Sequence, residues 1–325
     1  MIKKIYNLFK ILRKLSISGA IETLDQLKPV PFSLKILFKV FAVGSDKNEK
    51  NLGTSPGEKL CESLEDMGTT FIKLGQFLAT RPDIIGDKIA GDLEKLQDKL
   101  PAFDTEKAKS IIEREIGSKL FKNILSISKP VAAASIAQVH FAKIRIDDQE
   151  KDLAIKILRP NIHSLVNEEL DALMFLAFLI ESIFKKTKRL KLVEVISLLK
   201  EITNVEMDLR FEAAAANEFS ENTKNDSGFY VPKIYWNFTS EEILTLDWIE
   251  GISIREKEIL KSKKINIENI ATDIIQHFLR HAVRDGFFHA DMHQGNLFID
   301  DNGQIIPIDF GIMGRMDKLN RRYLA

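Results

Sequence analysis

The sequence predicts an α+β fold in which helices flank an antiparallel sheet. Two observations support this. Helical periodicity fills much of residues 1–128, and strand-like runs joined by tight turns appear from Pro130 onward and again near residue 300. The chain has 325 residues, enough for about two domains, and its 45% hydrophobic and 29% charged residues are ordinary for a protein that buries a core.

The first 44 residues are basic, with eight Lys or Arg and two acidic residues. Apolar residues recur there at helical spacing, at Ile5, Leu8, Phe9, Leu12 and Leu15, and residues 31–44 repeat the mixture of Phe, Leu and Lys. We expect two basic amphipathic helices. These helices either pack on the rest of the protein or bind an anionic membrane surface, and the sequence leaves both alternatives open.

Three features of the composition narrow the class of protein. Lys plus Arg equals Asp plus Glu, 47 each, which gives no sign of a nucleic-acid partner. The single cysteine, Cys61, excludes an intramolecular disulfide and is expected to be a small core residue. Residues 1–20 lack the continuous apolar region of a secretory signal, and the longest apolar stretch, 172–180, is about half of what a bilayer span requires.

The other elements are expected in chain order. Pro56 begins a helical stretch that Gly68 interrupts. The full set is helices at 56–67, 69–85 and 87–96, strands at 131–146 and 153–158 joined by a polar turn, helices from about 166 and from about 192, strand-like runs within 229–249, and a helix at 269–284.

The segment "FFHADMHQGNLFID" carries the residues of a kinase-type catalytic loop. His289, Asp291 and Asn296 reproduce H-x-D-x-x-x-x-N, and Asp309 begins a D-F-G tripeptide after a predicted hairpin with Asn302-Gly303 at its turn. In phosphoryl transfer of this kind an Asp orients the attacking hydroxyl, while an Asn and a second Asp bind magnesium. We therefore predict Asp291 as the catalytic residue and Asn296 and Asp309 as the metal ligands.

Residues that precede the catalytic loop in the chain are predicted to bind the phosphates of a nucleotide. "LAIK" matches the strand that carries the phosphate-binding lysine, here Lys156. A loop of small residues precedes it where kinases have a glycine-rich loop, and small residues let backbone N–H groups approach phosphate oxygens. This predicted nucleotide loop comprises Ala132, Ala133, Ala134 and Ser135. Spacing alone allows either Glu206 or Glu212 to pair with Lys156.

With these motifs the chain resembles the UbiB/AarF family of atypical kinases, which is linked to ubiquinone biosynthesis. "FIKLGQFLATRPDII" is similar to the KxGQ signature of that family, with Lys73 and Gln76 at the matching positions, and "EMDLRFEAAAANEF" is similar to its ExD element and αC glutamate. One departure is Gln294, where the family usually has Pro.

The resemblance implies an atypical protein-kinase-like fold, with an antiparallel N-lobe sheet, inserted helices and a helical C-lobe that is incomplete here. It divides the chain into basic N-terminal helices at 1–50, a KxGQ extension at 51–128, an N-lobe with a helical insert at 129–250 and a partial C-lobe at 251–325. Only 14 residues follow Gly311, so we expect the chain to be truncated at its C-terminus.

The resemblance also implies roles and partners. Glu212 would pair with Lys156, Glu206 and Asp208 would face Lys73 and Gln76, and Asp247, Trp248 and Ile249 would contact the nucleotide. The expected cofactors are ATP and Mg²⁺. A KxGQ helix over the site would disfavour protein substrates, so we expect a kinase or ATPase that acts on a lipid-like or quinone-precursor-like molecule. It would be cytoplasmic, peripheral to the inner membrane, and associated with other quinone-biosynthesis proteins.

Two alternatives compete with this reading. His289, Asp291 and His293, with His277 and His281 at i, i+4, have the residue types of a metallohydrolase site. That reading leaves Lys156, Asn296 and the D-F-G tripeptide unexplained. The other alternative is a nucleotide-binding scaffold without catalytic turnover.

Overall fold

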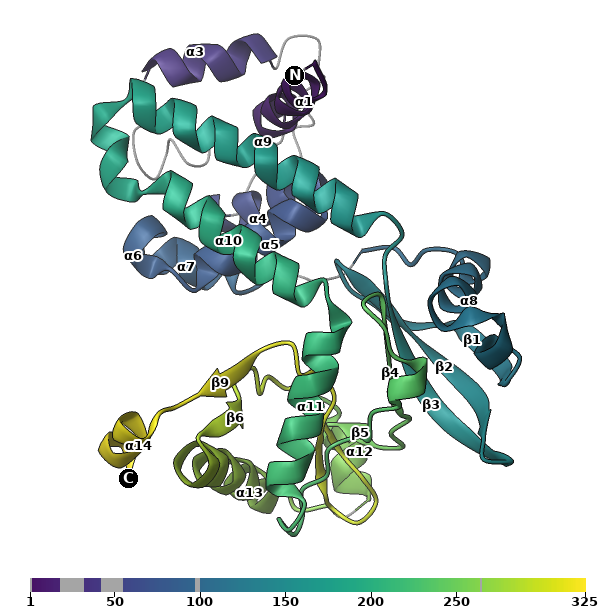
Figure 1. Cartoon of the computed structure of the whole chain (residues 1–325). Coiled ribbons are helices and arrows are strands. Elements are labelled where there is room, and N and C mark those ends of the chain that lie inside the picture. Colours follow the sequence, from purple (N-terminus) through teal and green to yellow (C-terminus); the bar gives the residue numbers. More distant parts are fainter. Residues whose placement is uncertain (1, 18–31, 42–54, 97–99, 264) are drawn as a thin grey trace. The chain divides into compact units, whose positions relative to one another are not determined.

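The computed structural model describes residues 2–17, 32–41, 55–96, 100–263 and 265–325, which group into two compact units (Figure 1). Unit 1 contains residues 1–101, 133–137 and 159–204, and unit 2 contains residues 102–132, 138–158 and 205–325. Among the described residues, no helix has the length and apolar character needed to cross a bilayer.

Unit 1 is helical. Its elements are α1 (Ile2–Ile17), α3 (Phe32–Phe41), α4 (Pro56–Met67), α5 (Thr69–Ala79), α6 (Pro82–Ile85), α7 (Asp87–Leu93), α9 (Ile162–Ile183), the 3₁₀ helix η1 (Lys185–Leu190) and α10 (Leu192–Glu206), whose last two residues belong to unit 2.

Local sequence signals set the helix boundaries around the KxGQ motif. Ser55 and Glu58 form a capping box at the start of α4, with the Ser55 hydroxyl accepting from the Glu58 N–H. Gly68, at φ 94°, separates α4 from α5. Helices α4, α5 and α7 then pack on one another, and Cys61 is buried in α4 as expected.

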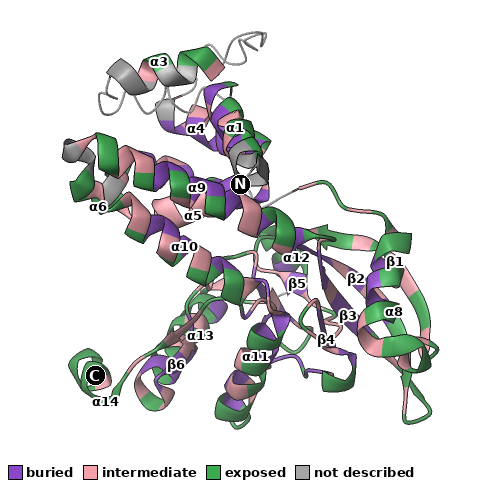
Figure 2. Ribbon diagram, turned by 45° about the horizontal axis from the view of Figure 1, so that its top comes forward, coloured by how far each residue is buried: buried purple, intermediate pink, exposed green. Residues whose placement is uncertain are grey.

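The two N-terminal helices pack on α9. Leu12 of α1 and Leu176 of α9 form a small core, against which Leu8, Leu15, Phe41, Ile180 and Phe184 pack. Lys14 forms an ion pair of 2.9 Å with Glu169 of α9. One face of the predicted amphipathic pattern is therefore used for packing, and Figure 2 shows that buried and exposed residues share the surface of α9.

Unit 2 holds the sheets and the remaining helices. Its elements are α8 (Thr105–Phe121), β1 (Ile124–Ala133), β2 (Ala137–Ile146), β3 (Gln149–Leu158), α11 (Leu209–Thr223), the 3₁₀ helix η2 (Trp236–Phe238), β4 (Ile243–Asp247), β5 (Ile252–Ser253), α12 (Lys257–Ser262), α13 (Ile267–Arg280), the π-helical turn η3 (His281–Asp285), β6 (Phe287–His289), β7 (Leu297–Ile299), β8 (Ile305–Pro307), β9 (Met313–Arg315) and α14 (Lys318–Leu324).

The main sheet has the order β1-β2-β3-β4, and β3 pairs antiparallel with β4 so that Lys156 lies opposite Leu244. Ile155 and Ile157 of β3 face a core shared with α8. Because side chains alternate along a strand, Lys156 points to the opposite face. That face meets α11, which packs beside β4.

The fold agrees with the predicted α+β class, with local differences. The β2–β3 hairpin forms, and its turn residues Asp147 and Asp148 have φ values of 50° and 61°. The single strand expected at 131–146 is in fact two strands, because the chain turns between Ala133 and Ala137. The helix expected at 87–96 ends at Leu93, and α8 was not predicted.

Candidate active site

Lys156 and Glu212 form the central ion pair of unit 2. The Lys156 Nζ lies 2.8 Å from Oε1 and 2.9 Å from Oε2 of Glu212. Their side chains are 18% and 7% exposed. Burial opposes charge on Lys156, but the carboxylates of Asp309 and Glu212 outweigh it and raise the lysine pKa, while burial raises the pKa of the Glu212 carboxyl. Of the two glutamates that spacing left open, Glu212 is the one in contact with Lys156.

The sequence of α11 explains how Glu212 reaches this position. Asp208 caps the helix by accepting from the Arg210 N–H, and its carboxylate pairs with the Arg210 guanidinium at 2.7 Å. Ala213 and Ala216 are fully buried, because their small side chains allow the helix to pack closely. Glu212, in the first turn of this helix, is itself buried and reaches Lys156 on β3.

The D-F-G segment lies beside this pair. Asp309 Oδ2 is 3.6 Å from Lys156 Nζ, and Asp309 Oδ1 accepts from the Gly311 N–H. Phe310 is 1% exposed and packs edge-on against Phe219 of α11, with ring centroids 6.4 Å apart. The Phe310 ring therefore packs against the same helix that carries Glu212.

His289 connects the catalytic loop to the D-F-G segment. Its Nε2 donates to the Asp309 carbonyl oxygen, and its Nδ1 accepts from the Asp291 N–H at 3.1 Å. Both contacts fit the neutral ring, and burial lowers the pKa of His289. His289 thus fixes the position of Asp291 relative to Asp309 through contacts with the backbone of both residues.

Asp291 and Asn296 lie together, as the motif predicts. The Asn296 Nδ2 donates to Asp291 Oδ2 at 3.1 Å and to the Asp291 carbonyl oxygen at 3.2 Å. The Asn296 carbonyl accepts from the Ile308 N–H, which places Asn296 next to the residue before Asp309. His293 Nε2 lies 3.7 Å from Asp291 Oδ2.

These residues have the chemistry of a magnesium site. The Asn296 amide uses its nitrogen toward Asp291, which leaves its oxygen for a cation, and the Asp309 side chain is 45% exposed. Amide and carboxylate oxygens are the hard ligands that Mg²⁺ prefers. Asn296 and Asp309 therefore fit the metal that the sequence motif implies.

The alanine-rich loop and the KxGQ helix belong mostly to unit 1. The Thr69 hydroxyl at the start of α5 donates to the Ser135 carbonyl oxygen at 2.9 Å, and the Arg159 guanidinium donates to the Ala134 carbonyl oxygen. None of Ala132, Ala133, Ala134 and Ser135 has a positive φ, which fits alanine in place of glycine. Lys73 and Gln76 are half-buried on α5 in unit 1, whereas Glu206 and Asp208 belong to unit 2. Their pairing stays a prediction.

The Asp247 carboxylate, at the end of β4, is engaged in hydrogen bonds within the protein. It accepts from the Tyr230 hydroxyl at 2.6 Å, the Tyr235 hydroxyl at 2.9 Å and the Lys233 N–H at 3.0 Å. The Trp248 N–H donates to the Asp152 carbonyl oxygen, and Ile249 is half-buried. A contact between this segment and a nucleotide would therefore use backbone atoms or apolar surface rather than the Asp247 carboxylate.

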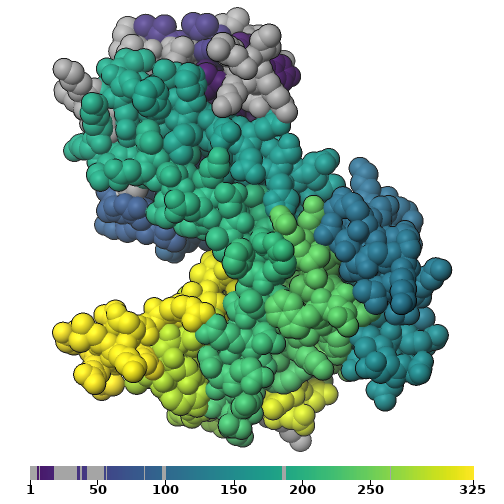
Figure 3. Space-filling view, viewed as in Figure 1, coloured from purple at the N-terminus to yellow at the C-terminus, as the bar shows by residue number. Residues whose placement is uncertain are grey.

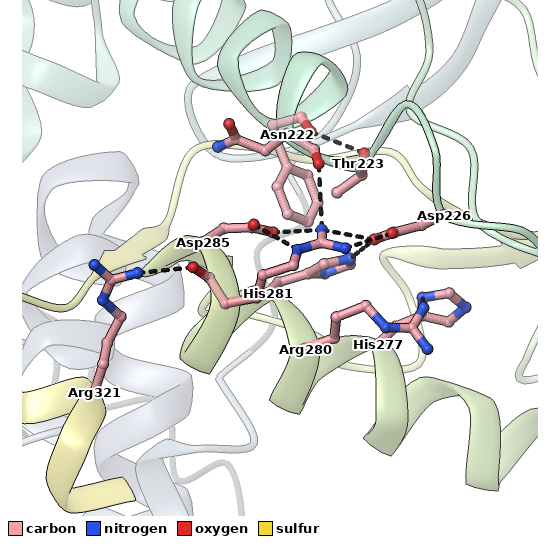
Figure 4. Close-up of polar contacts among 10 residues, drawn as sticks. Asn222, Thr223, Asp226, His277, Arg280, His281, Asp285 and Arg321 are labelled. Atoms are coloured by element: carbon pink, nitrogen blue, oxygen red, sulfur yellow. Dashed lines mark hydrogen bonds and ion pairs between the residues drawn. The ribbon is translucent and has the colours of Figure 1, made fainter. Parts of the chain in front are cut away.

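The five residues of the metallohydrolase alternative do not form one site. Figure 4 shows His277 and His281 with Asp226 instead, and His281 Nε2 lies 3.0 Å from Asp226 Oδ2. Arg284 contacts both Asp226 oxygens, at 2.7 and 3.0 Å, so a guanidinium already occupies the carboxylate. Both ring nitrogens of His289 are engaged as described above. The metallohydrolase reading is not supported by this geometry.

The Asp226 cluster is a feature that the motifs did not indicate. Arg284 also donates to the Asn222 carbonyl oxygen near the end of α11, which satisfies one carbonyl that the helix leaves open. Phe219 is fully buried, with its ring against those of Phe229, His281, Phe287 and Phe310. The end of the helix that carries Glu212 is therefore fixed to the segment that leads into the catalytic loop. No sequence motif indicated this cluster, because its residues are far apart in the chain.

A strand lysine paired to a helix glutamate, beside an H-x-D-x-x-x-x-N loop and a D-F-G segment, defines a protein-kinase-like fold. The model of the family described as ABC1 atypical kinase-like domain matches residues 95–325. The chain belongs to this family, and the resemblance drawn from the sequence motifs is confirmed.

Two curated relatives carry the name "Probable protein kinase UbiB". The protein from Marinobacter nauticus is 34% identical over 310 residues, which is 94% of this chain and 56% of the relative. The protein from Histophilus somni is 38% identical over 269 residues, which is 81% of this chain and 49% of the relative. The chain thus spans about half the length of the curated relatives it matches.

A solved structure titled "The complex structure of Rv3197-erythromycin from Mycobacterium tuberculosis" is also similar. It is 26% identical, has a TM-score of 0.49, and the match covers 78% of this chain and 63% of that chain.

Proposed function

We propose that the chain is the nucleotide-binding part of an atypical kinase or ATPase that uses Mg-ATP and supports ubiquinone biosynthesis. The observation that carries the proposal is the buried Lys156–Glu212 pair, with Asp309 3.6 Å from the same ammonium. A charged lysine held between two carboxylates is placed to receive the phosphates of a nucleotide, and the two relatives named as UbiB protein kinases support the pathway.

Each residue of the site has a part in this proposal. Lys156 would grip phosphate oxygens while Glu212 fixes its position. Asn296 and Asp309 would hold Mg²⁺, which neutralises charge on the phosphates when bound. Asp291, 39% exposed and held by Asn296, would orient an attacking hydroxyl or water.

The substrate is proposed to be a lipid-like or quinone-precursor-like molecule rather than a protein. In this proposal Lys73 and Gln76 of α5 engage Glu206 and Asp208 and restrict access to the nucleotide. The protein would work in the cytoplasm at the surface of the inner membrane, with other quinone-biosynthesis proteins.

Thermal unfolding with and without Mg-ATP tests the nucleotide site. A ligand present at 100 times its Kd stabilises the folded state by about 2.7 kcal/mol, so Mg-ATP should raise the melting temperature. Asp309→Asn should abolish the rise, and so should chelation of the metal.

Asp301→Asn is the matched control, because Asp301 is an exposed carboxylate on the same β7–β8 hairpin that pairs with Lys263 and lies outside the proposed site. It should retain the full rise. An equal rise in D309N and D301N would remove the assignment of Asp309.

A further inference from the structure

The C-terminal end of α9 exposes large apolar side chains. Phe175 and Phe178, one turn apart, are 49% and 56% exposed, and Ile183 at the last position of the helix is 66% exposed. The buried residues of α9, such as Leu173 and Leu176, lie on the face opposite the two phenylalanines. The two phenylalanines are therefore not needed to hold α9 in unit 1.

The turn that follows these side chains is cationic. Residues 185–191 contain five basic residues and no acidic one. Lys188 and Arg189 are exposed, and within the described part of the chain neither forms an ion pair. Lys191 pairs with Glu194, but both side chains are about two-thirds exposed, at 65% and 69%. The space-filling view shows α9 and α10 in teal at the surface of unit 1 (Figure 3).

Helix α3 adds to the same end of α9. Phe41 of α3 and Phe184, just after α9, pack on the same Leu12–Leu176 core. Beside Phe41, Lys39 is exposed and Val40 is 63% exposed. Apolar side chains and cations are thus interspersed around the end of α9.

We propose that this end of unit 1, which we call the hairpin tip (Phe175, Phe178, Ile183, Lys188 and Arg189, with Lys39 and Val40 of α3), docks on an anionic lipid bilayer. The proposal deepens the membrane association in the proposed function and rests on it. Exposed apolar side chains enter the boundary between headgroups and acyl chains, while neighbouring cations meet lipid phosphates. A second copy of the chain fits less well, because two hairpin tips would bring like charges together.

Sedimentation of the full chain with lipid vesicles tests the hairpin tip. The unmodified chain should bind phosphatidylcholine vesicles that contain phosphatidylglycerol, bind pure phosphatidylcholine vesicles weakly, and lose affinity as salt is raised. Each cation near an anionic surface contributes on the order of a fivefold gain, so K188E/R189E should weaken binding by roughly 25-fold or more. F178S/I183S should weaken binding by roughly tenfold, because both side chains would leave apolar surroundings.

Matched variants separate the hairpin tip from general effects of charge and hydrophobicity. K188R/R189K keeps the charge and should bind like the unmodified chain. K119E/K122E makes the same charge change at exposed positions of unit 2, and I275S removes a side chain that is 60% exposed on α13. Both should retain binding to within about twofold.

Point variants are preferable to removal of residues 1–44. Leu8, Leu12 and Leu15 of α1 cover Leu176 and Ile180, so truncation would expose a new apolar face of α9. If K188E/R189E and F178S/I183S bind vesicles as tightly as the unmodified chain, the proposal is wrong. Absence of binding by the unmodified chain would also overturn it and would direct the search to an acidic protein partner. Because the Mg-ATP melting shift requires no lipid, failure of the hairpin tip and failure of the nucleotide site are distinguishable.

Discussion

Lys156 on β3 and Glu212 on α11 lie 56 positions apart in the chain, and their side chains meet at 2.8 Å. Glu212 Oε1 also lies 3.5 Å from the Phe310 N–H. One carboxylate therefore contacts both the strand lysine and the D-F-G segment.

Removal of Glu212 should be costly, whereas removal of the whole pair should not. Glu212→Ala leaves the Lys156 ammonium with Asp309 at 3.6 Å as its remaining carboxylate in the site. A buried charge that loses its partner typically costs about 3–5 kcal/mol, while apolar replacement of both partners is often nearly neutral. Urea unfolding should show E212A less stable than K156M/E212L, and E194A, in the exposed Lys191–Glu194 pair, should change by about 0.5 kcal/mol or less. Equal midpoints for E212A and K156M/E212L would contradict this account.

Acid should destabilise unit 2 through its buried histidines. Burial lowers the pKa of His281 to about 4, although the hydrogen bond to Asp226 acts in the opposite direction. Burial also lowers the pKa values of His277, His289 and His140. The unfolded chain then binds more protons than the folded one below an ordinary histidine pKa of about 6.5, so stability is lost as pH falls from about 6.5 toward about 4.

The His281→Asn variant isolates one of these groups. His281 is surrounded by Asp226, Arg284, Asp285 and His277, and it is 1% exposed. Each group that titrates only in the unfolded chain adds about 1.4 kcal/mol per pH unit to the slope of unfolding free energy. Urea midpoints between pH 5 and pH 6 should therefore fall less steeply in H281N. A slope identical to that of the unmodified chain would mean that His281 is already charged in the folded state.

Gly75 in the KxGQ motif should resist even a methyl group. A Cβ added there would lie 2.4 Å from Leu96 Cδ1 and 2.8 Å from Leu64 Cδ1, and both leucines are buried. Overpacking of this kind costs about 1–3 kcal/mol, which exceeds the gain of up to about 1 kcal/mol from replacing a helical glycine by alanine. G75A should lower the urea midpoint. Gly91 on α7 has nothing within 4 Å of its added Cβ, so G91A should raise the midpoint slightly, and a similar effect in both variants would argue against close packing at Gly75.

Lys73→Ala tests whether α5 restricts the substrate. If Lys73 and Gln76 engage Glu206 and Asp208, K73A should change ATP turnover and increase phosphate transfer to a generic protein. Lys88→Ala, at an exposed position of α7, is the control and should behave like the unmodified chain. Both activities are measured with and without lipid. Efficient protein phosphorylation by the unmodified chain would refute the restriction, and unchanged activities in K73A would leave Lys73 a residue of a packed helix.

Local patterns were sufficient to predict many elements of the fold. The β2–β3 and β7–β8 hairpins follow from polar turns between apolar runs, with Gly303 at φ 82° in the second turn. The helix start at Pro56 follows from capping signals, and the start at Asp87 follows from helical periodicity, because both signals act within a few residues. Motif spacing also indicated that Asp291 and Asn296 belong together, since five residues of chain allow little separation.

Longer distances along the chain were decided by packing. Spacing allowed two glutamates to reach Lys156 and the family resemblance implied Glu212, and the structure places Glu212 in contact with the lysine at 2.8 Å. The basic N-terminal pattern fitted both a packed helix and a membrane helix, and the Leu12–Leu176 contact shows that one of its faces is packed.

The sequence by itself thus determined the family, the local elements and the short-range members of the site, because these depend on neighbouring residues. Only the tertiary structure decided which face of each amphipathic helix is buried, and that Asp226, His281 and Arg284 join the end of α11 to the catalytic segment. Those choices depend on side chains from distant parts of the chain competing for the same buried space, and no local pattern records the outcome of that competition.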